Sequence, residues 1–423
     1  MLLKFKVENF RSIKSAVLDF TRKSDERAGT EMMTSLVEKQ NYVDGVVPVM
    51  AVFGANASGK SNFMKALLCM QRYILTDGLS MREPFKLDEK SQDLPTEFTI
   101  ELLLDGRICE YVLRIDDVHV MKESLHVIDD DKRDCIFDIG VDNENNRVEL
   151  PVSEKFVQFE QYDFRRCFLG YVYHKIKGNE KYDGFKAMVN ERGLEERYEI
   201  ILHVYEFFQK KLCLIDNVRS TSSPIQFLES AQGKNGWKLK AGEVLKEMGL
   251  DLVLATYLPG QGDTIEDNIN YYHSGAVGGY YKLKSFREES LGTRNLLLFV
   301  QMVLDVLSVG GCLCVDEIDR TLHTDIIVFI LHLFKSRRFN KYGAQLICTS
   351  HNPCIMLWLN KYEITVVSKF NQVSRFERIS DEKFGINEGK DILQEYIKGH
   401  LGGVPRMRTV MFYDDVSEET AGD

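Results

Sequence analysis

One eight-residue segment limits the fold of this chain more than any other feature. Residues 54–61 read Gly-Ala-Asn-Ala-Ser-Gly-Lys-Ser, after the apolar, strand-like run 46–53 and before a helix-like stretch at 62–73. Glycines near both ends let the backbone wrap closely around an anion, so that successive N–H groups and a helix N-terminus point at it. Because this strand–loop–helix context is the one the motif requires, the segment predicts a phosphate-binding loop in an α/β core.

Two side chains of this loop have specific expected roles. Lys60 is placed to reach the β- and γ-phosphates of a nucleoside triphosphate, and Ser61 to ligate magnesium. An accidental match in a Gly/Ser-rich turn is the alternative, and the flanking strand and helix disfavour it. We therefore expect ATP and Mg²⁺ as ligands, with nucleotide contacts from Gly54, Asn56, Ser58, Gly59, Lys60, Ser61 and Asn62.

Composition narrows the class of protein. The 423 residues suggest two to three domains. A net charge of −10 argues against a protein that coats nucleic acid electrostatically. Basic clusters at 175–177, 210–211 and 335–341 leave a local DNA contact open, although such clusters are more often solvated faces.

Targeting and redox signals point to the cytoplasm. No run approaches the roughly 18 apolar residues of a membrane span, and the N-terminus alternates instead of forming a signal-peptide core. The nine cysteines are scattered without Cys-x-x-Cys, so neither a disulfide framework nor a zinc site is indicated. We expect a cytoplasmic protein with no membrane partner.

The hydrophobic pattern predicts a discontinuous α/β domain. Residues 1–150 hold the phosphate loop and strand-like runs at 2–20, 98–104, 108–115, 118–128 and 135–139, which indicate an antiparallel lobe. Residues 151–285 predict a mainly helical insertion, with helices at 194–215 and 225–254 and a glycine-rich loop at 260–279. Residues 286–405 return to alternating helix and strand, and 406–423 form an acidic tail.

An apolar strand, residues 311–315, ends in the carboxylates Asp316 and Glu317. This pair suits magnesium and a nucleophilic water, with Asp316 holding the ion and Glu317 orienting or deprotonating the water. Downstream, His351 follows a short apolar run, and upstream Ser290 opens a helix whose N–H groups and hydroxyls form another anion site. Alone, His351 is a surface histidine and Ser290 an N-cap.

In this order the motifs resemble those of the ABC-type ATPases of the SMC, RecF and OLD kind, and among them the small anti-phage ATPases of the AbiL and RloA type. The matching segments are 9–12 (N-terminal strand motif), 54–61 (Walker A), 289–293 (a variant signature), 315–319 (Walker B and D-loop), 322–323 (D-loop helix), 349–353 (H-loop) and 396–405. Ser-Leu-Gly-Thr replaces the usual Leu-Ser-Gly-Gly of the signature. The Q-loop glutamine is unassigned, with Gln158 and Gln161 as candidates.

The resemblance implies a head-to-head homodimer in which each ATP lies between Walker A of one protomer and the signature of the other. It implies that Ser290 and Gly292 contact ATP across the interface, that Asp319 lies near that interface, and that His351 contacts the γ-phosphate. It also implies that Arg11 contacts the nucleotide. Hydrolysis is then expected to require the dimer, and assembly beyond the dimer is open.

Two functions, which belong to different classes of protein, agree with these motifs. In the first, the ATPase is a sensor and scaffold in anti-phage defence that controls a separately encoded effector, a nuclease or toxin. The 53 residues after Phe370 are too few for a nuclease domain of roughly 100 residues, so we expect none on this chain. In the second, a DNA-repair or DNA-clamping ATPase of the RecF or SMC kind binds DNA directly. The negative charge favours the first, and the motifs disagree with a transporter ATPase.

Overall fold

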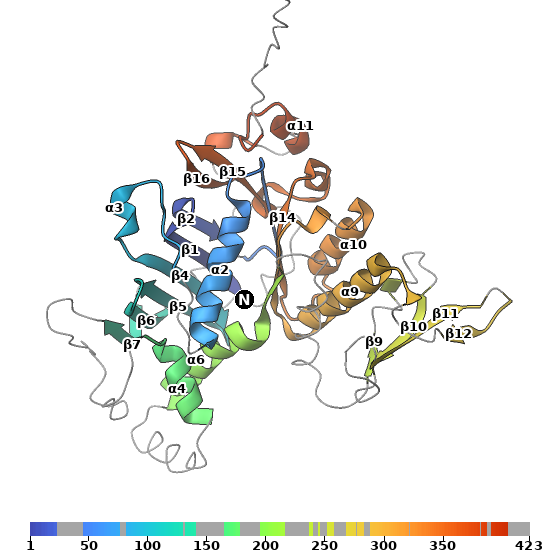
Figure 1. The fold of residues 1–423 in the computed structure, drawn as a ribbon, viewed down its shortest axis with the longest axis horizontal. Coiled ribbons are helices and arrows are strands. Elements are labelled where there is room, and N and C mark those ends of the chain that lie inside the picture. Colours follow the sequence, from blue (N-terminus) through green and yellow to red (C-terminus); the bar gives the residue numbers. More distant parts are fainter. Residues whose placement is uncertain are drawn as a thin grey trace, which may run out of the picture.

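The computed structural model of the protein describes residues 1–22, 45–76, 82–129, 132–140, 165–177, 195–215, 237–239, 244–245, 252–257, 268–275, 277–282, 288–320, 322–380, 382–386 and 391–404. Within them, two six-stranded sheets with helices between and beside them form the body, and a smaller four-stranded sheet lies at one end (Figure 1).

The first sheet is the predicted antiparallel lobe, with strand order β2-β1-β4-β5-β6-β7. Its strands are β1 (Leu2–Phe10), β2 (Ile13–Asp19), β4 (Thr96–Leu104), β5 (Arg107–Ile115), β6 (Val120–Asp129) and β7 (Lys132–Gly140). The predicted N-terminal hairpin is confirmed, with Phe10 opposite Ile13. Asp105 and Gly106 both have positive φ, 50° and 78°, as a two-residue hairpin turn between right-twisted strands requires.

The second, main sheet has the order β16-β15-β3-β14-β13-β8, parallel except for the edge strand β16. Its strands are β3 (Val49–Gly54), β8 (Leu212–Ile215), β13 (Cys312–Val315), β14 (Gln345–Ser350), β15 (Ile364–Phe370) and β16 (Val373–Arg378). All residues of β3, β13 and β14 are buried, as expected for parallel strands covered on both faces. The continuous apolar runs predicted at these positions are confirmed.

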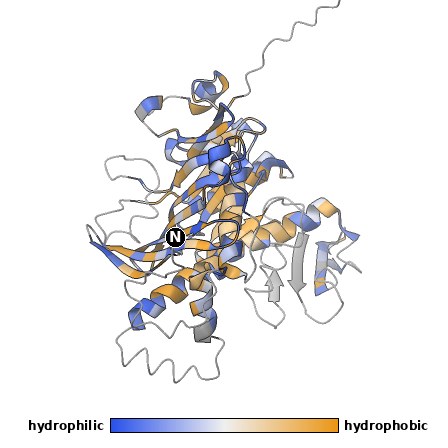
Figure 2. Cartoon of the chain, turned by 60° about the vertical axis from the view of Figure 1, so that its left-hand side comes forward, coloured by the Kyte–Doolittle hydropathy of each residue, from blue (hydrophilic) through white to orange (hydrophobic). Residues whose placement is uncertain are grey.

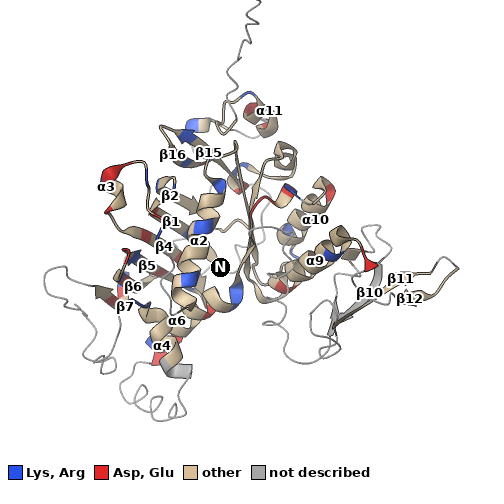
Figure 3. Ribbon diagram, in the orientation of Figure 1, with Lys and Arg blue, Asp and Glu red and all other residues tan. Residues whose placement is uncertain are grey.

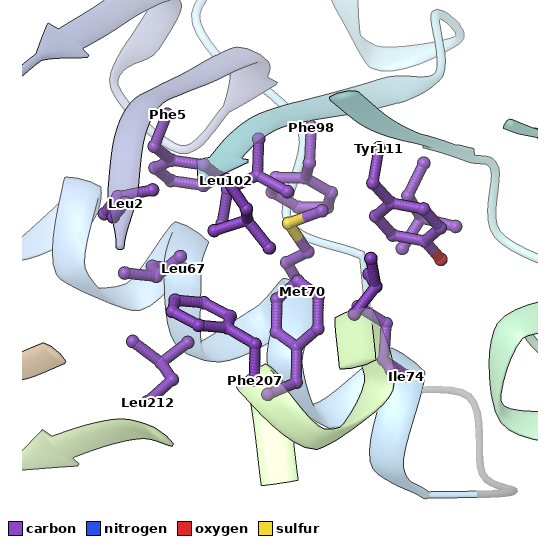
Figure 4. Packing of buried hydrophobic residues seen from close by; sticks show 14 of the residues in the cluster. Leu2, Phe5, Leu67, Met70, Ile74, Phe98, Leu102, Tyr111, Phe207 and Leu212 are labelled. Atoms are coloured by element: carbon purple, nitrogen blue, oxygen red, sulfur yellow. The ribbon is translucent and has the colours of Figure 1, made fainter. Parts of the chain in front are cut away.

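Helix α2 (Lys60–Leu75) lies between the two sheets and belongs to the same hydrophobic cluster as α4 (Phe168–Lys177) and α6 (Glu195–Glu206). Figure 4 shows Leu67 and Met70 of α2 between Phe5 and Leu102 of the lobe and Phe207 and Leu212 below. Residues of β3 alternate between this cluster and a second one, on the other face of the main sheet, with α9 (Leu291–Val309) and α10 (Thr324–Lys335). The main sheet is thus covered on both sides.

Helix α9 is the one described helix that is long and apolar enough to cross a membrane, but 67% of its most apolar window is buried inside the protein. Figure 2 shows the hydrophobic residues along α9 and the neighbouring strands. Its composition is accounted for by packing in the second cluster. The remaining described helices are short: α3 (Glu89–Gln92), α11 (Ile392–Ile397), a π-helix (Phe207–Lys211) and 3-10 turns at Ile318–Arg320, Pro353–Trp358, Lys361–Glu363 and Glu382–Phe384.

The region between residues 151 and 285 differs from its prediction. The helix expected over 194–215 ends in the π-helix, and Leu212–Ile215 is strand β8, which pairs in parallel with β13. A four-stranded antiparallel sheet, β12-β11-β10-β9, was not predicted. Its strands are β9 (Trp237–Leu239), β10 (Leu252–Tyr257), β11 (Ile269–Ser274) and β12 (Tyr280–Lys282). Residues 237–239 and 252–254 are therefore strand where helix was predicted over 225–254, and residues 269–274 are strand where a loop was predicted over 260–279, because cross-strand pairing outweighed the local pattern. Residues 244–245 are helical, and much of both ranges lies outside the described residues.

A buried carboxylate joins this region to the antiparallel lobe. Glu123 of β6 is fully buried, and its carboxylate accepts hydrogen bonds from the N–H groups of Phe168 (2.6 Å) and Leu169 (2.8 Å) and from the Tyr111 hydroxyl (2.8 Å). Burial raises the pKa of Glu123 to about 7, against these three bonds, which lower it. Glu123 therefore anchors the start of α4 on the lobe.

Candidate nucleotide site

The predicted motifs meet at one edge of the main sheet. Gly54 ends β3, Asp316 directly follows β13 and His351 directly follows β14, and these three parallel strands are neighbours in the order β3-β14-β13. Because the carboxyl ends of parallel strands open to the same edge, the loops that follow them converge there. The sheet order thus places the H-loop between Walker A and Walker B.

The Walker A loop has the backbone of a phosphate cradle. Gly59 has φ 111° and Ala57 φ 59°, and a Cβ on Gly54 would lie 2.5 Å from the Val367 carbonyl oxygen. No side chain caps α2 at Gly59, so the helix N-terminus is open to an anion. The Oγ of Ser58 is buried and has no hydrogen-bond partner among the residues that the structure describes. These features fit a bound phosphate chain.

Lys60 lies inside the loop and is only 5% exposed. Its Nζ donates to the carbonyl oxygens of Gly54 (2.7 Å) and Ala55 (3.1 Å) and lies 3.5 Å from Nδ1 of His351. Burial lowers the pKa of Lys60, while the negative charges of Asp316 and Glu317 oppose that shift. Two predicted site residues that are 291 positions apart are thereby brought together.

The two acidic residues after β13 are both hydrogen-bonded to a residue for which the sequence pattern predicted no role. The Thr349 hydroxyl donates to Oδ1 of Asp316 (2.5 Å) and accepts from the backbone N–H of Glu317 (2.7 Å). The backbone of Glu317 has φ 49°, which lies in the left-handed region that residues other than glycine rarely adopt. Its Oε2 accepts from Arg320 (3.1 Å). Thr349 lies in the H-loop motif, two residues before His351. That position in the motif was the one sequence signal that could have pointed to its role.

The D-loop and H-loop are also hydrogen-bonded to each other. Oδ2 of Asp319 accepts from the backbone N–H of His351 (3.0 Å), and its Oδ1 is buried and has no hydrogen-bond partner among the described residues. Asp319 and His351 therefore contact each other within one protomer, which was not predicted. A second role of Asp319 at a protomer interface stays a prediction.

The signature residues lie apart from this cluster. Ser290 caps α9, with its Oγ accepting from the Thr293 N–H (3.1 Å), and both Ser290 and Gly292 are exposed. The preceding Glu289 pairs with His273 of β11 (2.5 Å). Among the described residues of one protomer, no hydrogen bond joins Ser290 or Gly292 to Walker A or Walker B.

Arg11 stands in the turn of the N-terminal hairpin with φ 51°. Its guanidinium pairs with Glu83 (2.5 Å), and its backbone N–H donates to the Glu83 carbonyl oxygen (2.7 Å). Nucleotide contact by Arg11 stays a prediction. The Q-loop candidates Gln158 and Gln161 and the tail from residue 405 lie outside the described residues.

The donor set for magnesium is small. Within the described part of the chain, no cluster of three or more His, Cys, Asp or Glu side chains could hold a metal ion by itself. Mg²⁺ is usually held by one or two protein oxygens together with substrate phosphates and water. Asp316 and the Ser61 hydroxyl fit that mode, so they match an ion that arrives with a nucleotide.

A family model described as "AAA domain, putative AbiEii toxin, Type IV TA system" matches residues 49–148 and 254–356, just under half of the chain. The first match includes the whole Walker A motif, and the second includes the signature, Walker B and H-loop. No curated protein matches the sequence.

Two solved structures resemble the chain weakly. The Smc head bound to the C-winged helix domain of ScpA has a TM-score of 0.39 at 14% identity, over 89% of this chain and 97% of that one. The Smc head domain with an extended coiled coil bound to the C-terminal domain of ScpA, from Pyrococcus furiosus, has a TM-score of 0.38 at 15% identity, over 89% and 95%. TM-scores this low support no conclusion about function. The chain is thus similar to the AAA domain that this family model describes over the two segments that hold Walker A, Walker B and the H-loop, and these motifs meet at one edge of the main sheet.

Proposed function

We propose that the protein binds ATP with magnesium and hydrolyses it slowly. The observation that carries the proposal is the pair of Asp316 and Glu317 at the end of β13, both hydrogen-bonded to Thr349; β14 lies between β13 and β3, the strand that leads to Lys60. Lys60 would exchange its two carbonyl contacts for the β- and γ-phosphates, and Glu317 would orient and deprotonate the attacking water. His351, beside the Lys60 ammonium, would contact the γ-phosphate. Mg²⁺, held by Ser61 and Asp316, would neutralise charge on the phosphate oxygens.

We propose further that hydrolysis takes place in a head-to-head homodimer. Ser290 and Gly292 are exposed at the start of α9 and make no hydrogen bond to the Walker residues of their own protomer among the described contacts. A second protomer would bring them to the ATP. Leu291, between them, is 56% exposed, which supports an interface at the signature loop.

The biological role that we propose is control of a separately encoded effector, a nuclease or toxin, in anti-phage defence in the cytoplasm. The description of the matching family, which names a putative toxin of a type IV toxin–antitoxin system, supports a defence role. DNA clamping is the second candidate. Figure 3 shows basic and acidic residues on elements throughout the described part of the chain, and the net charge of −10 favours a protein partner over DNA.

Two substitutions test the ATPase proposal because they should fail in different ways. Lys60→Ala removes a phosphate contact and should weaken nucleotide binding, whereas Glu317→Gln keeps the shape of the site and should retain ATP without turnover. Nucleotide binding and phosphate release are measured on both variants and on the wild type. Undiminished turnover in Glu317→Gln would contradict the assignment of Glu317.

A further inference from the structure

Strand β16 runs directly behind the Walker A loop, although it is more than 300 residues later in the chain. Ser374 of β16 is 1% exposed, and its Oγ donates to the carbonyl oxygen of Ser58 (2.6 Å). Its backbone N–H donates to the carbonyl oxygen of Ser12 (2.9 Å), in the turn of the N-terminal hairpin. Ser374 therefore joins the Walker A loop to the N-terminal motif.

The hydroxyl groups at this junction form a chain of hydrogen bonds in which every donor points the same way along the chain. Oγ of Ser374 lies 2.7 Å from Oγ of Ser12, and the Asn62 amide donates to Oγ of Ser12 (2.8 Å). A serine hydroxyl has a single proton to donate. Since Ser374 donates to Ser58, it must accept from Ser12, which in turn accepts from Asn62. We call Asn62, Ser12, Ser374 and the Ser58 carbonyl group the serine relay.

The serine relay packs against the loop without space between them. A Cβ on Gly59 would lie 2.1 Å from Oγ of Ser374 and 2.9 Å from Oγ of Ser12. Atoms in a packed protein do not come this close, so a side chain at this position would force the Walker A loop or the two serine side chains to move. Gly59, the second glycine of Walker A, therefore has no room for a side chain where it faces β16. This requirement adds to the close approach of phosphate that is expected on its other side.

The relay sets the orientation of one peptide group of the loop. The C=O of Ser58 and the N–H of Gly59 belong to the same planar trans peptide, so they point in opposite directions. With the carbonyl oxygen directed at Ser374, the Gly59 N–H points away from Ser374, which is the orientation that this N–H needs if it is to bind a phosphate on the opposite side of the loop.

We propose that Ser374 and Ser12 are positioning residues for ATP binding, which hold the Ser58–Gly59 peptide in its phosphate-binding orientation before the nucleotide arrives. This inference rests on the proposed function. It gives the N-terminal motif a task at the ATP site through Ser12, without a direct contact to the nucleotide. Preorganisation lowers the ordering cost of binding, so its loss should appear in affinity.

The test uses Ser374→Ala, Ser12→Ala and their combination, with Ser368→Ala on the neighbouring strand β15 as the matched control. Binding of a fluorescent ATP analogue with Mg²⁺, steady-state KM and kcat, and the melting temperature are measured on each. We expect about tenfold weaker binding in each single variant, equal to about 1.4 kcal/mol. KM should rise while kcat at saturation stays within about twofold. The double variant should lose less than the product of the two effects, because both residues act in one chain.

Folded Ser374→Ala that binds as tightly as Ser368→Ala would overturn the inference. If Ser374→Ala does not fold, Ser12→Ala decides in the same way, since Ser12 lies in a half-buried turn. Wild-type protein that binds no ATP would overturn the proposed function and the inference with it. Wild-type binding with an unaffected Ser12→Ala and Ser374→Ala would overturn only the inference.

Discussion

The Thr349→Val substitution tests how the two Walker B carboxylates are held. Thr349 is 1% exposed, and its hydroxyl makes two hydrogen bonds, one to the Asp316 carboxylate and one from the Glu317 N–H. Valine has a similar shape and can make neither. A hydrogen bond to a charged group contributes about 1.5–3 kcal/mol and a neutral one about 0.5–1.5 kcal/mol. The free energy of unfolding should therefore fall by about 2–4.5 kcal/mol.

The effect on catalysis should be larger than on nucleotide binding. The lost bond from the Glu317 N–H supports a backbone conformation, φ 49°, that is unfavourable by itself. Without it the Glu317 carboxylate should lose its orientation toward the attacking water. If about 1.4–2.8 kcal/mol of this support acts in the transition state, kcat falls about 10- to 100-fold. The affinity for ATP, which depends on Lys60 and the loop, should change little.

Phosphate release at saturating MgATP measures kcat, and thermal unfolding measures stability. Thr349→Ser keeps the hydroxyl and should retain most of the activity. Thr365→Val is the matched control, because Thr365 is equally buried on strand β15 of the same sheet and its hydroxyl contacts only the sulfur of Met50 (3.2 Å) among the described contacts. A Thr349→Val protein that is folded and turns over ATP within twofold of the Thr365→Val rate would refute the reasoning.

Three further outcomes are expected. Ser290→Arg in a Glu317→Gln background should abolish ATP-dependent dimerisation, while nucleotide binding by the monomer persists. Light scattering measures the dimer. If the dimer is still present, Ser290 acts only as a helix cap. Because the folded pKa of Glu123, about 7, is raised above its ordinary value of 4.5, its protonated form is favoured by folding, and stability should fall as pH rises from about 4.5 to about 7. Thermal unfolding of Glu123→Gln should lack that part of the pH dependence. Purified protein with ATP and magnesium or manganese should leave DNA and RNA intact, and cleavage that persists in Lys60→Ala would indicate a nuclease site on this chain.

The local sequence pattern was sufficient to predict the structure where a motif and its flanking strands and helices are contiguous in the chain. The strand, loop and helix around Walker A were predicted within a few residues, as were the N-terminal hairpin and the strand before Asp316. Each has a periodicity or a turn signal that depends on neighbours in the chain. The convergence of Lys60, Asp316 and His351 followed from the family resemblance, and the sheet order accounts for it.

What could not be predicted depends on partners that are far away in the sequence. The apolar run Leu212–Ile215 continues the helical spacing of α6, and its pairing with β13 alone makes it a strand. Short apolar runs are ambiguous between helix and strand. Thr349 and Ser374 are ordinary β-strand residues by local pattern. Their hydrogen bonds to Asp316 and Ser58 exist because the fold brings segments that are 33 and 316 positions apart in the sequence into contact.

The position of β16 behind the Walker A loop has a consequence for synthesis of the protein. Ser374 follows Ser58 by 316 residues, and at about 5–20 residues per second a ribosome needs roughly 15–60 s to make the intervening chain. Until then the loop lacks its support from β16, and the parallel strands β13, β14 and β15 that flank or extend the sheet are also absent. A nascent chain that has completed only the Walker A segment therefore lacks the strands that complete the proposed ATP site, and we expect nucleotide to stabilise the protein only after residue 374 has emerged.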